Sequence, residues 1–303
     1  MYRDETPYTE VRESENSYET RLGYWRAAEG LQAVDGLEVS EYGRTLGRRY
    51  VEGEASAERI AAEAAEHYAS SSSREHEEAD IVAARITLLL ETTQFVLSPR
   101  TLYSIHSTLF RGVFRDDWVG VSRTVNLAKK EPVLGGRSVI YADFRQIPAQ
   151  LDYDFGIERA AKRREHLLTK DLSGLATFVG NVWQTHPFRE GNTRTIAVFT
   201  ELYLRSLGFL VNNEPFAEHS VYFRDALVRA NFSSLELDVD EEHTFLERIL
   251  SNIVLGTAYD LTADDLNVHG IRQDLELAYR PVPDHDIEGR LSPEHVPENC
   301  QYH

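Results

Sequence analysis

The sequence predicts a mainly α-helical protein with one small β-hairpin, and three observations support this fold class. Apolar residues recur at helical spacing along most of the chain, most strongly from Ile81 to Phe95. Residues typical of helix starts precede several such runs, as Ser98 and Pro99 do at an N-cap and a first helical position. One stretch, residues 131–144, breaks the helical pattern with a Gly-Gly pair between β-prone residues. We therefore expect a bundle of helices that carries a two-stranded flap.

The composition is that of a globular and strongly acidic chain. Its 303 residues are 42% hydrophobic, which allows one large domain plus a smaller one. With 50 acidic against 32 basic residues, the net charge of -18 argues against nucleic acid or an anionic membrane as the direct partner. The single cysteine, Cys300, excludes an internal disulfide and fits a reducing compartment. No run approaches the ~20 apolar residues of a membrane-spanning helix, so we expect a cytoplasmic protein.

The chain divides at a serine run, Ser70 to Ser73, which is the clearest loop signal of its first half. Before this run, Ser40 and Ser56 stand at the starts of short amphipathic segments. After Gly256 the sequence becomes polar and rich in proline, a composition typical of disorder. The expected division is a disordered N-terminus at 1–17, a helical module at 18–70, a second helical domain at 80–257 and a polar, partly disordered tail at 258–303.

Two apolar helices of the second domain flank a loop at residues 186–192. The helix after this loop is expected to end at Gly208, because glycine is typical of C-terminal stops. The flap is expected on either side of Gly135 and Gly136, and an irregular surface loop is the alternative there. His106 lies on an apolar helix face, where we expect a structural role and no metal binding.

The loop between these helices groups residue types suited to phosphate chemistry. A loop that leads into a helix N-terminus presents free N–H groups and the positive end of the helix dipole to an anion. Gly191 permits close approach of the backbone, Asn192 can cap the helix or donate to a phosphate oxygen, and Arg194 can hold a second phosphate. Glu190 is the carboxylate that can bind a divalent cation, for which we expect Mg²⁺. His186 is the candidate general base for an attacking hydroxyl. Each residue taken singly also fits an ordinary turn or helix cap.

Taken together, the residues of this loop resemble the signature of the Fic family, His-Pro-Phe-x-(Asp/Glu)-Gly-Asn-Gly-Arg-x-x-Arg. Seven positions match in order, namely His186, Pro187, Phe188, Glu190, Gly191, Asn192 and Arg194. The resemblance extends over about residues 80–256 and includes a helix and loop at 102–126, the flap at 137–141 and a segment at 222–231. It implies a Fic-type helical bundle with a small β-hairpin flap.

The resemblance implies a protein adenylyltransferase, an enzyme that transfers AMP from ATP to a Ser, Thr or Tyr hydroxyl of a target protein. It implies His186 as the base, Glu190 as the ligand of Mg²⁺, and ATP as the co-substrate. The nucleotide-binding residues that it implies are Glu190, Gly191, Asn192, Thr193, Arg194, Phe223 and Asn231. The flap residues that would hold an extended target segment are Ser138, Val139, Ile140 and Tyr141. Core packing is the alternative role for Phe223.

The N-terminal module resembles the small antitoxin partners of Fic toxins, here fused to the enzyme. In these partners a Ser/Thr-x-x-x-Glu-Gly/Asn motif blocks the productive placement of ATP. Two registers of this chain fit the motif in part, because one gives Asp35 and Gly36 and the other keeps Glu29, and both lack the hydroxyl residue. Asp35, Gly36 and Glu29 are therefore the inhibitory candidates. The alternative is that these helices only complete the core.

Two positions depart from the Fic signature. Thr193 stands where the family has glycine, and Ala197 stands where it has a second arginine. In the family that arginine holds the γ-phosphate and pairs with the inhibitory glutamate, and Arg205 is one candidate for its replacement. Two alternatives to AMP transfer follow from the loss: a catalytically weak Fic-like regulatory or binding protein, and transfer of another phosphate-containing group such as phosphocholine. The sequence predicts neither the target nor the oligomeric state.

Overall fold

The computed structural model describes residues 17–92, 94–163 and 172–268 of the chain. The disorder expected at the N-terminus and in the polar tail therefore falls largely outside the described residues. The described part of that tail packs on the core through Leu261 and Leu266. Most described residues are helical, which confirms the fold class, and no helix among them is both long and apolar enough to cross a membrane.

The elements follow one another in an order that places the two strands between α5 and α6. The helices of the described residues are α1 (Tyr18–Gly30), α2 (Glu41–Val51), α3 (Ala57–Ser70), α4 (Glu77–Leu90), α5 (Pro99–Phe110), α6 (Ile147–Ala160), α7 (Leu172–Thr185), α8 (Asn192–Ser206), α9 (Glu214–Glu218), α10 (Ser220–Arg229) and α11 (Thr244–Leu255). Short 3₁₀ segments are η1 (Leu31–Asp35), η2 (Pro132–Leu134), η3 (Phe144–Gln146) and η6 (Ala263–Leu266). The strands are β1 (Ala128–Lys130) and β2 (Ser138–Ile140).

Serine caps begin α1, α2, α3 and α5. The side chains of Ser17, Ser40, Ser56 and Ser98 each accept a hydrogen bond from the main-chain N–H three residues on, at 3.1 to 3.3 Å. The helix starts expected at Ser40, Ser56 and Ser98 are thereby confirmed, and Pro99 occupies the first turn of α5. Each cap satisfies a donor that the helix itself leaves free, so this signal is local and readable from sequence.

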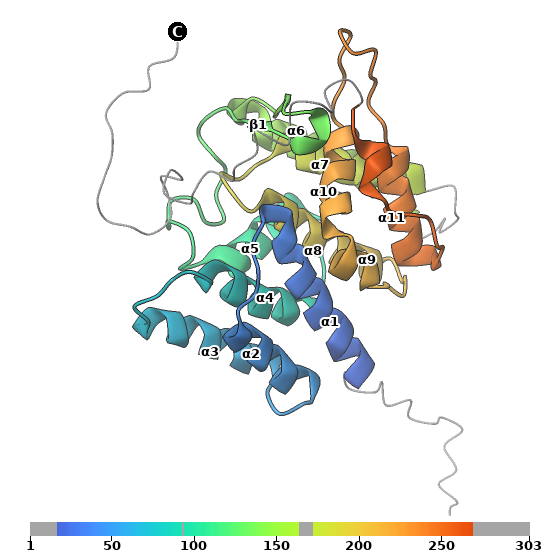
Figure 1. Ribbon diagram of the computed structural model, residues 1–303. Coiled ribbons are helices and arrows are strands. Elements are labelled where there is room, and N and C mark those ends of the chain that lie inside the picture. The colour runs from blue at the N-terminus through green and yellow to red at the C-terminus, as the bar shows by residue number, and fades with distance from the viewer. Residues whose placement is uncertain (1–16, 93, 164–171, 269–303) are drawn as a thin grey trace, which may run out of the picture.

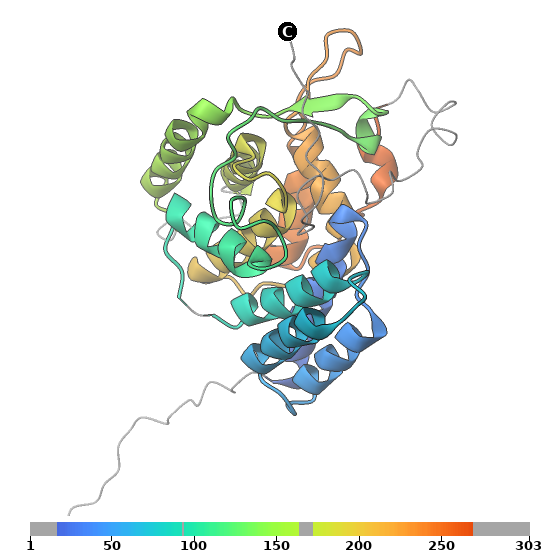
Figure 2. The same cartoon turned by 90° about the vertical axis from the view of Figure 1, so that its left-hand side faces the viewer.

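Helix α8 lies at the centre of the molecule (Figures 1 and 2), and every residue from Asn192 to Leu204 is buried. Helices α4, α5 and α7 pack against it, together with η1. Helix α1 lies against α4 and α9, and α3 packs against α4 across the serine run that begins at Ser70. One continuous hydrophobic cluster therefore joins the N-terminal helices to the rest of the described chain.

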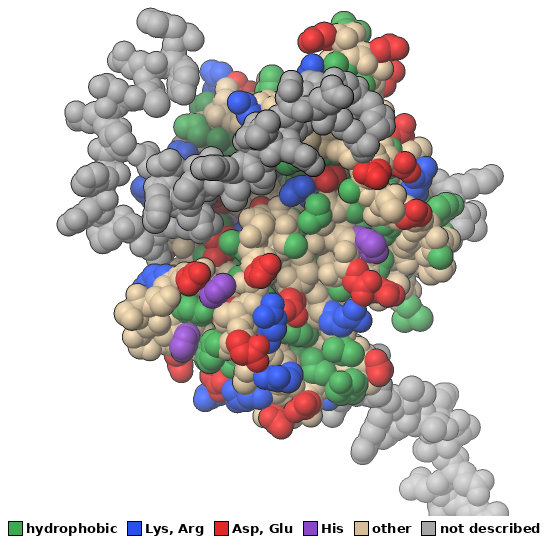
Figure 3. Space-filling model, viewed as in Figure 1, with side chains coloured by type: hydrophobic (Ala, Val, Ile, Leu, Met, Phe, Trp, Pro, Cys, Tyr) green, Lys and Arg blue, Asp and Glu red, His purple; other side chains and the backbone are tan. Residues whose placement is uncertain are grey.

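The start of α4 is fixed by Asp80, which is fully buried. Its carboxylate accepts hydrogen bonds from the Ser40 main-chain N–H at 2.8 Å and from the Tyr68 hydroxyl at 2.7 Å. Charged side chains of both signs are interspersed over the lower part of the face in Figure 3, around α2 and α3. The buried carboxylate thus holds three helices together beneath a mixed, solvated surface.

The two-stranded flap is confirmed, but its first strand lies earlier than expected. Strands β1 and β2 pair antiparallel, with Ala128 opposite Ile140. Val133 and Leu134 form η2 and are buried, so this apolar pair turns into the core and leaves the hairpin. The connection between the strands is consequently longer than a two-residue turn, and Gly135 adopts the left-handed conformation that ends η2.

Candidate active site

The loop between α7 and α8 is held in shape by its own residues. Gly191 has a φ of 73°, and a Cβ atom there would lie 2.4 Å from the Phe110 ring, so both backbone and space require glycine. The Asn192 side chain donates to the Phe188 carbonyl at 2.8 Å and accepts from the Phe188 N–H at 3.0 Å. Gly191 and Asn192 therefore shape the loop that leads into α8, whose first N–H groups point out of the helix end.

His186 begins the loop and is nearly covered. The residue is 9% exposed, and the Tyr141 ring stacks on the imidazole with ring centres 3.6 Å apart. Burial holds the pKa of His186 well below its ordinary value, and the positive charges of Lys129 and Arg123 lower it further. The imidazole is thus neutral at neutral pH, which is the form that accepts a proton. Its Nδ1 atom has no hydrogen-bond partner among the described residues.

Glu190 stands at the open side of the loop. Its side chain reaches solvent, yet the surrounding protein desolvates the carboxylate and raises its pKa to about 7, and Asp35 and Glu78 raise it further by repulsion. Its main-chain carbonyl accepts a hydrogen bond from His106 Nε2 at 3.0 Å, while His106 Nδ1 accepts the Gly120 N–H at 2.9 Å. These partners fix one neutral tautomer of His106, whose pKa burial lowers to about 4. The structural role expected for His106 is confirmed.

The surroundings of Glu190 fit a magnesium ion. Within the described ranges, no three His, Cys, Asp or Glu side chains are grouped to hold a metal ion among themselves. Mg²⁺, however, is commonly bound by one or two carboxylates together with substrate phosphates and water. Desolvation and the nearby negative charges of Asp35 and Glu78 raise the pKa of the Glu190 carboxylate. A dication at Glu190 would compensate these negative charges and neutralise a bound phosphate chain.

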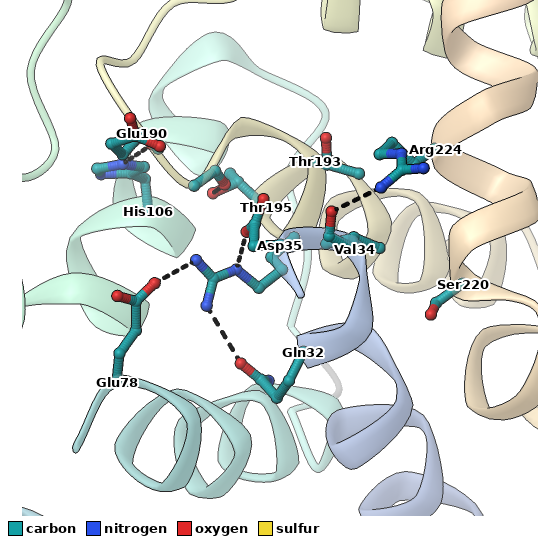
Figure 4. Close-up of polar contacts among 12 residues, drawn as sticks. Gln32, Val34, Asp35, Glu78, His106, Glu190, Thr193, Thr195, Ser220 and Arg224 are labelled. Atoms are coloured by element: carbon teal, nitrogen blue, oxygen red, sulfur yellow. Dashed lines mark hydrogen bonds and ion pairs between the residues drawn. The ribbon is translucent and has the colours of Figure 1, made fainter. Parts of the chain in front are cut away.

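Protein oxygens surround the guanidinium of Arg194, in the first turn of α8; the side chains that supply them, Asp35, Glu78 and Gln32, are labelled in Figure 4. The Arg194 Nε atom lies 2.8 Å from Asp35 Oδ2, its Nη2 donates to Glu78 Oε1 at 2.6 Å, and its Nη1 donates to Gln32 Oε1 at 3.1 Å. The Phe110 ring covers the guanidinium at 5.0 Å. Although burial alone would lower the pKa of Arg194, the two carboxylates raise it and keep the group charged. In this structure all three guanidinium nitrogens face protein oxygens.

The two departures from the Fic signature have different consequences. The hydroxyl of Thr193 accepts a hydrogen bond from the indole nitrogen of Trp183 at 3.1 Å, so it is directed to the core. Ala197 is fully buried. Arg205 does not replace the missing arginine, because it donates to the Leu90 carbonyl and lies over the Tyr24 ring near the far end of α8.

The two residues expected near the nucleotide base serve packing in this structure. Phe223 is fully buried and packs edge-on against Phe216, so core packing describes its surroundings. Asn231 donates to the carbonyls of Gly180 and Leu227 at 3.2 and 2.9 Å and joins α7 to α10. A contact of either side chain with a nucleotide stays a prediction.

The flap residues alternate between two environments. Val139 and Tyr141 are buried, whereas Ser138 and Ile140 face solvent, Ile140 with 75% of its surface exposed. The buried Tyr141 stacks on His186, so the flap lies directly beside the candidate base. This strand alternation gives β2 one face against the core and one face open to solvent.

The two alignments of the inhibitory motif, one with Asp35 and Gly36 and the other with Glu29, fall at different places in the structure. Asp35 ends η1 and reaches Arg194, and Gly36 closes that segment with a φ of 69°. Glu29 instead pairs with Arg44 of α2 at 2.8 Å. The N-terminal module therefore reaches Arg194 through Asp35 and Gln32, while Glu29 pairs within the module.

Four further residues that contact or influence the loop lie outside the motif from His186 to Arg194. Gln32 and Glu78 reach Arg194 from positions 162 and 116 residues away in sequence. Lys129 lies on β1, close enough to lower the pKa of both His186 and Glu190. Arg123 belongs to the stretch that resembles Fic domains, but its contacts depend on where the flap meets the loop.

Comparison with known proteins identifies the region around this loop. Residues 96–204 match the Fic/DOC family, and this range contains both the flap and the loop from His186 to Arg194. Over 167 residues the chain is 28% identical to the protein adenylyltransferase VbhT of Bartonella schoenbuchensis. That match covers 49% of this chain and 32% of the relative, so the chain spans about a third of the relative's length.

Two solved structures are also similar to this chain. One is the N-terminal Fic domain of the effector protein Bep8 from Bartonella sp. 1-1C, with 18% identity and a TM-score of 0.47 over 60% of this chain and 87% of that one. The other is a Fic-domain-containing signaling protein from Bacteroides thetaiotaomicron, with 13% identity and a TM-score of 0.49 over 77% and 83% of the two chains.

Proposed function

We propose that this protein is a protein adenylyltransferase that transfers AMP from ATP to a Ser, Thr or Tyr hydroxyl of a target protein. The observation that carries the proposal is a neutral His186 held at the entrance to the N-terminus of α8, with Glu190 in the same loop. A neutral imidazole can accept a proton, and a helix N-terminus attracts the charge of phosphate. The family match of residues 96–204 supports the same chemistry.

The reaction balances with the groups present. His186 takes the proton of the target hydroxyl while the hydroxyl oxygen forms a bond to the α-phosphorus. The bond between that phosphorus and the bridging oxygen breaks, and pyrophosphate leaves. Glu190 would hold Mg²⁺, which neutralises the phosphate chain when bound. The edge of β2 that does not pair with β1 would pair with an extended segment of the target through main-chain hydrogen bonds.

The transfer is tested with ATP labelled on its α-phosphate. His186→Ala should lower label transfer about 10²- to 10⁴-fold, the usual contribution of a general base. His67→Ala, a matched histidine change on α3 outside the loop, should leave transfer unchanged. Transfer that survives His186→Ala in a folded variant would remove His186 from the mechanism. Parallel reactions with a phosphocholine donor and with other labelled nucleotides identify the group transferred.

We also propose that the N-terminal module restrains the enzyme through Asp35. The ion pair of Asp35 with Arg194 occupies a guanidinium that the family resemblance assigns to phosphate. Asp35→Asn keeps the shape of the side chain and removes its charge, so the affinity for ATP and Mg²⁺ should rise roughly tenfold, or ~1.4 kcal/mol. Titration calorimetry measures this change. Glu29→Gln is the control, because Glu29 pairs with Arg44. It should leave the affinity for ATP and Mg²⁺ unchanged.

The state of Arg194 also favours a second candidate, a catalytically weak Fic-like binding or regulatory protein. Glu78 and Gln32 would still hold the guanidinium after Asp35 is withdrawn. If Asp35→Asn binds ATP as weakly as the unchanged protein, restraint by the module is refuted. If neither protein transfers label from any donor, the weak binding protein becomes the better description.

A further inference from the structure

Arg123 is a buried arginine whose side-chain hydrogen bonds all go to main-chain carbonyls. The residue is 3% exposed. Its Nε donates to the His186 carbonyl at 2.7 Å, and one terminal nitrogen also approaches the Thr185 carbonyl at 3.3 Å. The other contacts are to the Val125 carbonyl and the Ala142 carbonyl, both at 2.5 Å. One guanidinium therefore joins four carbonyls.

These carbonyls belong to three different segments of the fold. Thr185 and His186 lie where α7 passes into the loop, Val125 precedes β1, and Ala142 follows β2. Arg123 therefore closes both ends of the flap and fastens them to the backbone of the candidate base. Because the guanidinium is a rigid planar fork, its bonds fix the spacing between these segments, which a lysine ammonium cannot do with its single nitrogen.

The same contacts stabilise an uncommon backbone conformation. His186 has a φ of 47°, which a non-glycine residue rarely adopts unless its surroundings hold it there. Arg123 Nε binds the carbonyl of that residue, and the Arg123 main-chain N–H binds the next carbonyl, that of Pro187, at 2.8 Å. The other end of the guanidinium binds Ala142, the neighbour of the Tyr141 ring that covers the imidazole.

We propose that Arg123 is a positioning residue that sets the distance between His186 and the target-binding flap. The role of the flap and of His186 in transfer rests on the proposed function, whereas the mechanical coupling does not. Loss of the fork would let β1, β2 and Tyr141 move away from the imidazole. The base would then be uncovered and misaligned, although the loop residues that face the nucleotide would be intact.

The coupling is tested without nucleotide, by carbethoxylation of histidines with diethyl pyrocarbonate and peptide mass spectrometry. In Arg123→Met, His186 should react several-fold faster than in the unchanged protein. His106, which is fully buried and hydrogen-bonded at both ring nitrogens, should react as slowly as before. Equal acceleration of both histidines would mean general loosening, and no acceleration would mean no coupling; either result overturns the proposal.

Two further variants separate positioning from folding. Arg145→Met removes an exposed arginine that pairs with Asp143 beside the flap, and it should change neither histidine. Arg123→Lys keeps the charge with fewer donors and should uncover His186 to a smaller extent. If Arg123→Met does not fold, as thermal melting would show, the comparison of His186 with His106 is made on Arg123→Lys and decides in the same way.

Activity provides an independent second measurement. In Arg123→Met the rate of label transfer should fall about 10²-fold, the effect of a displacement near 1 Å, while the dissociation constant for ATP with Mg²⁺ stays the same. A loss of ATP affinity equal to the loss of rate would refute positioning. If the unchanged protein transfers no label, the proposed function fails, and the histidine measurement still decides the coupling.

Discussion

The two ends of the loop between α7 and α8 are held by different kinds of contact. At the first end, His186 is fixed through its main chain by Arg123 and through its ring by Tyr141. At the second end, Arg194 is fixed through its side chain, by the carboxylates of Asp35 and Glu78. The first end is therefore held without using the atoms that would do chemistry.

The two ends of the loop therefore differ in which polar atoms the protein occupies: main-chain atoms at His186 and the guanidinium at Arg194. Main-chain contacts at His186 leave Nδ1 without a partner among the described residues. At Arg194, by contrast, the carboxylates of Asp35 and Glu78 lie against the buried guanidinium, where an anion would bind. Under the proposed function, an incoming phosphate would compete with two fixed negative charges there, so we expect the restraint on transfer at the arginine end.

The largest expected effect comes from removing the arginine of the restrained end. Arg194→Met leaves Asp35 and Glu78 without their cation, and breaking a buried pair in this way costs about 3–5 kcal/mol of unfolding free energy. Urea denaturation measures the loss. Arg44→Met, which removes the solvent-exposed partner of Glu29, should cost less than about 1 kcal/mol. Similar losses in both variants would mean that the Arg194 cluster behaves as a surface pair.

A smaller effect concerns the pH dependence of ATP binding and transfer, in which Glu190 and His186 should differ. The pKa of Glu190 is about 7, so below that pH the carboxyl gains a proton and Mg²⁺-dependent ATP binding should weaken, by about tenfold per pH unit. His186 stays neutral through the upper part of this range, because its pKa lies well below its ordinary value. ATP binding and label transfer should therefore decrease toward acid pH because Glu190 is protonated. This decrease is the acid limb of the pH profile.

Calorimetric titration of ATP with Mg²⁺ across the neutral range measures the acid limb. Glu190→Gln should bind weakly and lose the limb. A limb of unchanged position in that variant would assign the titration to another group.

The smallest expected effect concerns Glu201, a buried carboxyl on the same helix as Arg194. Burial raises its pKa to about 7, and the Asn213 amide, when it is oriented with its nitrogen toward Glu201, donates to the two carboxyl oxygens at 3.0 and 2.9 Å. Because the folded-state pKa lies above the unfolded value of about 4.3, the folded protein binds the extra proton and loses stability as pH rises through that window. Glu201→Gln should therefore raise the melting temperature above pH 7 by about 2–4 °C.

Differential scanning calorimetry at acid and alkaline pH checks this dependence. Near about pH 4.5 the substitution should bring no gain, since the carboxyl is then protonated in the folded state. A gain of the same size at both pH values would show that charge is not its cause.

Much of the fold and part of the site could be predicted from local sequence. The caps at Ser40, Ser56 and Ser98 and the two-stranded flap are short-range features, and the structure confirms them. The position of β1 was not predictable, because burial of Val133 and Leu134 depends on the core beneath them. A local apolar pair fits a strand and a buried 3₁₀ turn equally well.

The sequence by itself determined the family resemblance, the order of His186, Glu190 and Arg194 in one loop, and the mainly helical fold. These features depend on neighbours in the chain, since capping, periodicity and loop geometry act over a few residues. Only the tertiary structure decided which groups neutralise Arg194 and which carbonyls Arg123 joins. Those contacts cross many residues of sequence, and they form because burying a guanidinium requires partners wherever the fold supplies them.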